Sequence, residues 1–170
     1  WYQKGGLILY GLQDLIGERN LNNGFKAYMH AAKFREKAPF TTTTEWYDYI
    51  KSVTPDSMQY YLEDSFEKIT LYSNKATEAT YKKLENDTYE VTIHVESKKE
   101  FFDGNGTQVG SSEKPNLLDI GIFENDGKNE NGMTSKSPLM IKKEWVKPGK
   151  SKYTFITKKL PLKAGIDPYN

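Results

Sequence analysis

Apolar residues recur at helical spacing over about the first seventy residues of the chain and at every second position in the segments that follow. The first part predicts about four helices, and the second part predicts strands. The helices are expected over residues 3–16, over residues 20–35, around Trp46, Tyr47 and Ile50, and from Pro55 through Phe66. Gly17 is a natural end for the first helix, Thr44 or a neighbouring threonine can cap the third, and Thr54 can cap the fourth.

The first helix is apolar on most of its faces, with Gln13 and Asp14 as the clear polar positions. A helix of this kind is stable when it is buried in a larger body. We therefore expect some of its apolar side chains to face outward where a partner domain packs, and we expect the free chain to self-associate through this helix. The residues expected at that surface are Trp1, Leu7, Ile8 and Tyr10.

Alternation of apolar and polar residues predicts strands at residues 88–97, 117–123, 138–146 and 152–160. Clusters of Asn, Asp and Gly at residues 85–87, 103–106 and 125–137 predict the turns and loops between them. Short strands punctuated in this way predict an antiparallel, Ig-like β-sandwich. The predicted fold is therefore α+β, with a helical domain at residues 1–68 followed by a β-sandwich domain at residues 69–170.

The chain of 170 residues holds 24 Lys and Arg against 23 Asp and Glu, and the two signs are mixed along it. This balance gives no electrostatic case for binding nucleic acid or an anionic membrane surface. The sequence has no cysteine, which excludes disulfides, thiolate metal sites and cysteine nucleophiles. It has no apolar run near the ~18–20 residues that span a bilayer, and its first residues lack the pattern of a signal peptide. We expect that Trp1 is not a natural terminus.

His30 and His94 lie too far apart in sequence to form the paired zinc ligands of a helical peptidase motif. We therefore expect no zinc site within this chain. The segments DGNGT and NDGKNENG are rich in oxygen ligands but lack the ligand spacing of a calcium loop, and they predict hairpin turns. Glu63, Asp64 and Glu67 are expected to form a solvated acidic face on the fourth helix.

The opening residues add a resemblance to a known family. Tyr2, Lys4 and Gly5 form Y-x-K-G and run straight into the apolar helix, which resembles the aminopeptidase N-like (gluzincin) zinc peptidases just downstream of their metal site. The second helix is similar to the family's F-x-x-G-L-x-x-Y segment at Leu21, Gly24, Phe25 and Tyr28. The third helix is similar to its T-T-x-D-L-W-x-x-L segment at Thr43, Thr44, Glu45, Trp46 and Ile50. Glu45 takes the acidic place there, and Trp46 is displaced toward the leucine position. Residues 53–72 and the closing AGIDPYN are similar to a bacterial branch whose peptidase region is fused to an ABC-transporter-like permease.

This resemblance implies that the chain is the C-terminal region of a larger zinc peptidase. Residues 1–68 would complete the back of the catalytic domain, and residues 69–170 would form the sandwich that follows it. In this family zinc and a glutamate activate a water, and the tyrosine of Y-x-K-G donates a hydrogen bond to the oxyanion of the tetrahedral intermediate. Tyr2 has this implied role. The zinc ligands would lie upstream of Trp1, so the chain alone is expected to hold no cofactor and to be inactive. The implied partners are the upstream catalytic domain and a peptide substrate, and the implied location is bacterial, periplasmic or membrane-associated.

The alternative is a non-catalytic interaction module, in which the sandwich binds a protein partner, a glycan or a membrane-proximal domain of a transporter or sensor. The sequence immediately upstream of Trp1 distinguishes the two classes. H-E-x-x-H followed about 18 residues later by an acidic ligand supports a peptidase, whereas a degenerate version supports a scaffold or sensor.

Overall fold

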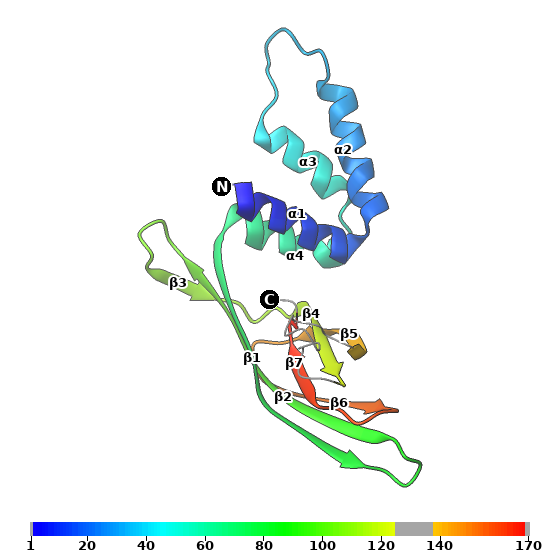
Figure 1. The fold of residues 1–170 in the computed structure, drawn as a ribbon. Coiled ribbons are helices and arrows are strands. Elements are labelled where there is room, and N and C mark those ends of the chain that lie inside the picture. The colour runs from blue at the N-terminus through cyan, green and yellow to red at the C-terminus, as the bar shows by residue number, and fades with distance from the viewer. Residues whose placement is uncertain (1, 125–137, 169–170) are drawn as a thin grey trace. The chain divides into compact units, whose positions relative to one another are not determined.

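A computed structural model describes residues 2–124 and 138–168, with the side chains of the first helix described from Lys4 onward. The chain divides into two compact units, Trp1–Ile69 and Thr70–Asn170, and this boundary lies one residue from the predicted one. The first unit holds the helices and the second holds antiparallel sheets (Figure 1). The predicted α+β fold with an N-terminal helical part is therefore confirmed.

The helical unit begins with three α-helices, α1 (Tyr2–Ile16), α2 (Glu18–Ala32) and α3 (Thr43–Val53). Gly17 separates the first two with a φ of 85°, a left-handed conformation that glycine adopts without steric cost. α2 ends at Ala32, three residues before the predicted end. Thr42 caps α3, because its Oγ1 accepts a hydrogen bond from the backbone N–H of Glu45 at 3.1 Å.

The fourth predicted helix is not a single α-helix. The segment consists of a 3₁₀ turn (η1, Asp56–Met58), one α-helical turn (α4, Gln59–Leu62) and a π-helical turn (η2, Glu63–Glu67). Thr54 does not cap it, since Thr54 ends α3 and its Oγ1 donates a hydrogen bond to the carbonyl of Ile50 at 2.8 Å. The solvated acidic face is also wrong at Asp64, which is buried at 5% exposure. The α-helical spacing that grouped these acidic residues does not hold across a π turn.

Every helix of the unit contributes to its core. The buried cluster consists of Leu12, Ile16, Leu21, Ile50 and Leu62. A close approach of α2 to α3 at Gly24 brings the elements together: a Cβ there would lie 2.8 Å from Val53 Cγ2 and 3.3 Å from the carbonyl oxygen of Tyr49. Only glycine allows this packing distance without a shift of α3.

The second unit contains two sheets. The first is built around β2 (Tyr89–Phe102), which pairs with β1 (Ile69–Lys83), β3 (Gln108–Ser111) and β6 (Gly149–Thr157). The second has the order β5 (Pro138–Val146), β4 (Asn116–Phe123) and β7 (Lys163–Ile166). β2 and β6 are antiparallel from the pair Tyr89 and Thr157 to the pair Ser97 and Gly149.

Residues from both sheets form one hydrophobic cluster: Val91, Ile93, Val95, Ile120, Ile122, Val146 and Ile166. The two sheets therefore face each other across a shared core, which is a sandwich arrangement. The strands predicted from alternation correspond to β2, β4, β5 and β6. The pattern did not single out β1, which is mostly exposed, or β3 and β7, which have only four residues each.

The predicted turns at 85–87 and 103–106 join strands, as expected. Asp103 Oδ1 accepts hydrogen bonds from the backbone N–H groups of Asn105 and Thr107, both at 2.9 Å. The Asp103 side chain thus accepts hydrogen bonds from backbone N–H groups of the turn, so DGNGT is a structural turn between β2 and β3. The loop expected at 125–137 lies outside the described residues.

Candidate functional site

The sequence singles out Tyr2 as the one residue with an implied catalytic role. The structure places Tyr2 at the first residue of α1, followed by an exposed Lys4 on the same helix. Gly5 and Gly6 have open space where a Cβ would stand. The Y-x-K-G sequence is thus the first turn of a helix.

The other positions of the resemblance lie where helices pack. Leu21 and Gly24 are buried on α2, and the ring of Phe25 lies 6.3 Å from that of Trp46 on α3, measured between ring centroids. The rings of Tyr28 and Tyr49 meet edge-on at 5.9 Å. These residues hold α2 against α3 and so specify the helical scaffold.

Glu45, in the acidic place of the third helix, is tied to Arg35. The guanidinium donates to both carboxylate oxygens, at 2.7 Å to Oε1 and 2.8 Å to Oε2. This hydrogen bonding holds the pKa of Glu45 below its ordinary value and raises the pKa of Arg35. A carboxylate held in this way is a poor proton acceptor, and its role is to join the end of α2 to the start of α3.

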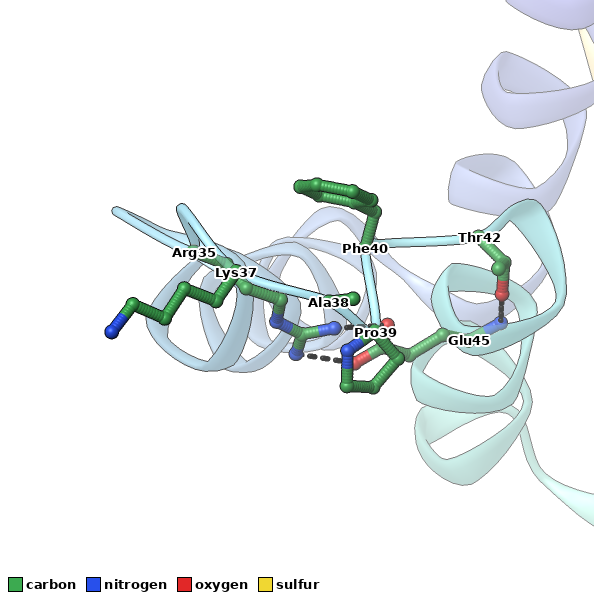
Figure 2. Close-up of a pocket in the computed structure, with 7 residues that line it drawn as sticks. All are labelled: Arg35, Lys37, Ala38, Pro39, Phe40, Thr42 and Glu45. Carbon is green, nitrogen blue, oxygen red and sulfur yellow. Dashed lines mark hydrogen bonds and ion pairs between the residues drawn. The ribbon is translucent and has the colours of Figure 1, made fainter.

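A pocket of about 510 Å³ lies beside this pair, lined by Arg35, Lys37, Ala38, Pro39, Phe40, Thr42 and Glu45 (Figure 2). Figure 2 shows the Arg35 guanidinium turned back toward Glu45, while Lys37 extends away from the pair. The Phe40 ring stands on the outer side of the loop. The Arg35 guanidinium and the Glu45 carboxylate, which both line the pocket, are paired with each other and are not free to orient a ligand.

α1 is fastened to the last part of the unit by Tyr61. Its hydroxyl donates a hydrogen bond to the carbonyl of Ile8 at 3.0 Å, and burial raises the pKa of its phenol. A Cβ at Gly11 would lie 2.3 Å from the Tyr61 hydroxyl oxygen, so glycine is needed there. The register of α1, and with it the position of Tyr2 along the helix axis, depends on this contact.

The outward face of α1 carries two of the residues expected there. Leu7 and Tyr10 are exposed at 71% and 72%, whereas Ile8 is half-buried and Trp1 lies outside the described residues. Leu12 and Ile16, on the opposite face, are buried in the helical core. α1 thus has apolar residues on two faces and buries only one of them within its own unit.

The two histidines lie on separate units. His30 is exposed in the last turn of α2, and His94 is half-buried on β2, opposite Lys152 of β6. Across residues 2–124 and 138–168, no group of three or more His, Cys, Asp or Glu side chains is placed to hold a metal ion. Within the same residues, no helix has the length and apolar character needed to cross a membrane.

Comparison with protein-family models and with curated protein sequences found no match to this chain. The evidence on function is therefore the motif series and the geometry of the two units.

Sequence reasoning missed the Arg35–Glu45 pair and the loop that it closes. Phe34 and Phe40 lie on that loop and are far more exposed than most phenylalanines. The available signal was an apolar residue on each side of Pro39, within a stretch otherwise rich in Lys, Arg and Thr.

Proposed function

We propose that this chain is the C-terminal region of an aminopeptidase N-like zinc peptidase. In this proposal the helical unit completes the back of the catalytic domain, and the β-sandwich follows it. The observation that carries the proposal is the order of the motifs: Y-x-K-G opens α1, Leu21 to Tyr28 follow on α2, and the T-T-E-W segment opens α3. Three short motifs in the family's order on three successive helices are more specific than any one alone.

The packing roles of these residues fit the proposal. The motif positions on α2 and α3 hold the two helices together through Gly24 and the Phe25–Trp46 contact. A peptidase scaffold needs such a rigid helical base, because reacting groups must be held within a fraction of an ångström of their working geometry. The exposed Leu7 and Tyr10 of α1 form the surface that we propose packs against the upstream catalytic domain.

This chain's own residues do not fit a zinc site, since the sequence has no Cys and its two His belong to different units. The proposed zinc ligands therefore lie outside this sequence. What this chain contributes to the chemistry is the phenol of Tyr2, a neutral hydrogen-bond donor at pH 7 because a tyrosine pKa is near 10. A neutral donor suits an oxyanion that develops only in the transition state.

The test is made in the full-length protein with its upstream region. Tyr2→Phe removes one hydroxyl and should lower kcat by about 10²–10³, the usual cost of losing one oxyanion donor. KM should change little, because the hydrogen bond strengthens in the transition state. Steady-state kinetics on an aminoacyl substrate measures both constants.

Tyr81→Phe is the matched control, since Tyr81 is an exposed tyrosine on β1 and is not part of the packing surface proposed for α1. It should leave kcat unchanged. A Tyr2→Phe enzyme with the wild-type kcat would remove Tyr2 from the mechanism.

The second candidate is a non-catalytic interaction module of a membrane-associated transporter or sensor protein. The observation that favours it is β1, a strand of 15 residues at the edge of its sheet, exposed along most of its length. An extended segment of a partner could add to such an edge through backbone hydrogen bonds. An upstream sequence with a degenerate H-E-x-x-H would favour this module over the peptidase.

A further inference from the structure

The loop between α2 and α3, residues 33–42, carries two phenylalanines that are almost uncovered. Phe34 is exposed at 90% and Phe40 at 65%, and Met29, in the last turn of α2, is exposed at 59%. We call Met29, Phe34 and Phe40 the apolar tip. Figure 1 shows that this loop extends beyond the ends of both helices that it joins. Large apolar side chains exposed on one projecting loop mark a surface that binds something apolar.

Phe34 is also held in an unfavourable backbone conformation. Its φ is 59°, in the left-handed region that a bulky residue rarely adopts. Glycine or asparagine would relieve this strain, and a polar residue would be better solvated. A residue that is both strained and exposed points to a use for the side chain.

The base of the loop is fixed. The bidentate ion pair between Arg35 and Glu45 links its two ends, and Arg35 Nη2 also donates to the carbonyl of Ala31 at 3.3 Å. Thr42 closes the other side by capping α3. The apolar tip is therefore presented on a braced segment, so little ordering is needed when it binds.

Charge around the tip is basic. Lys33 and Lys37 are exposed on the loop, against one exposed carboxylate, Glu36, because Glu45 is paired with Arg35. The even balance of charge over the whole chain conceals this local excess. A basic surface that also carries aromatic side chains is complementary to the interface of an anionic bilayer.

We propose that the loop of residues 33–42 inserts its phenylalanine rings into the interface of an anionic lipid bilayer. The lysines lie beside the lipid phosphates in this arrangement. A bilayer fits better than a protein partner because both phenylalanines belong to one short loop. A stable protein–protein interface buries about 800 Å² on each partner, which is more than such a loop offers. This inference does not depend on the peptidase proposal.

Binding of this kind is weak, reversible and sensitive to salt. Each lysine near an anionic surface contributes about a fivefold change in the partition constant. High salt screens that contribution and leaves the contribution of the two rings. A single anchor of this size does not hold a protein permanently on a membrane.

The test is co-sedimentation of the chain with vesicles of phosphatidylcholine alone or of an equal mixture of phosphatidylcholine and phosphatidylglycerol. The wild type should bind the anionic vesicles, and its binding should weaken in high salt. The double variant Phe34→Ser, Phe40→Ser should lose binding. Lys33→Gln and Lys37→Gln should each weaken it about fivefold.

The control double variant is Val109→Ser, Leu162→Ser, which removes two apolar residues of similar exposure from the other unit. It should bind as the wild type does. Because the sequence has no cysteine, Phe34→Cys carrying an environment-sensitive fluorophore reports on this position alone. Its emission should shift to the blue with anionic vesicles, and the same label at Val109→Cys should not respond.

The proposal is overturned if the wild type does not bind anionic vesicles, or binds both vesicle types equally. It is also overturned if the phenylalanine double variant, with an unchanged circular dichroism spectrum, binds as well as the wild type. Loss of a dimer in the same variant, seen by sedimentation without vesicles, would instead make the tip a contact between two copies of this chain.

Discussion

The two units differ in what they leave on their surfaces. In the sandwich, alternate residues of β2 enter a core shared by both sheets, and the outward positions of β2 and β6 pair Glu96 with Lys150 and His94 with Lys152. In the helical unit, a smaller core is accompanied by strongly exposed Leu7, Tyr10 and Phe34. The comparison shows that the outer face of the β2–β6 pair mixes these charged residues with the exposed Ile156, whereas the most exposed apolar residues of the helical unit lie on α1 and on the loop after α2, at positions suited to partners.

The units also achieve close packing in different ways. The strands of the sandwich are held together by ladders of backbone hydrogen bonds. A residue can form these bonds regardless of which side chain it carries. Helices α2 and α3 instead depend on one position, Gly24, at which even a methyl group meets Val53 and the backbone of Tyr49. A Cβ at Gly121 of β4 would also be crowded, but by the side chains of Phe123 and Pro168, whereas at Gly24 the backbone of a second helix also lies within 3.3 Å.

The largest expected effect on stability tests this dependence. Gly24→Ala should lower the free energy of unfolding of the helical unit by about 1–3 kcal/mol, because overpacking forces α3 to move. Thermal unfolding followed by circular dichroism in the helical band measures it. Gly5→Ala is the matched control on α1, where a Cβ meets nothing within 4 Å. It should raise stability by about 0.5–1 kcal/mol, because alanine is the better helix former.

A destabilised Gly5→Ala, or an unaffected Gly24→Ala, would mean that the α2–α3 contact is looser than the structure has it.

The second prediction concerns the exposed face of α1. The free chain should self-associate at high concentration through Leu7 and Tyr10, and the double variant Leu7→Glu, Tyr10→Glu should be monomeric, because like charges would oppose each other across the contact. Sedimentation velocity over a concentration series measures the difference. Substituting Leu71→Glu on β1, also an exposed leucine, should leave self-association as it is.

If the wild type remains monomeric, the exposed face of α1 has no self-affinity. The contrast between the surfaces of the two units would then carry no consequence for association.

The smallest effect concerns pH. Arg35 holds the pKa of Glu45 below the ordinary value of 4.5, so the pair stabilises the folded state above that pH and loses its effect as pH falls and the carboxylate is protonated. The melting temperature of the wild type should exceed that of Glu45→Gln by a small margin at neutral pH. The margin should shrink as the pH falls below 4.5. Glu36→Gln, on the same loop, is the control and should show no such change. A margin that stays constant with pH would mean that Glu45 acts through its shape and not its charge.

The helices and the strands with strong alternation could be predicted because their apolar period is long and regular. β2 shows it over Val91, Ile93 and Val95, and all three are buried. β1 could not be predicted in this way. A strand that is exposed along most of its length has no buried face, so its sequence need not alternate between apolar and polar residues. The mixed helix after Pro55 was missed because 3₁₀ and π turns have no sequence signal comparable to the α-helical period.

The candidate site was predictable to a different degree. The motif residues of α2 could be placed on a helix from their spacing, but nothing in the sequence said that Gly24 meets α3 at close range. The Arg35–Glu45 pair was missed because its partners are separated by a loop, and tertiary folding alone brings them together. The role of Tyr2 rests on resemblance and stays a prediction.

The long edge of β1 has a further consequence, for aggregation. An exposed edge strand offers unpaired backbone groups to other chains, and a run of apolar residues along it would favour stacking into fibrils. β1 interrupts any such run with Lys75, Glu78, Lys82 and Lys83, all exposed. These charges would have to be buried or brought together in a stacked assembly, so they act as gatekeepers that oppose such stacking while the sheets form.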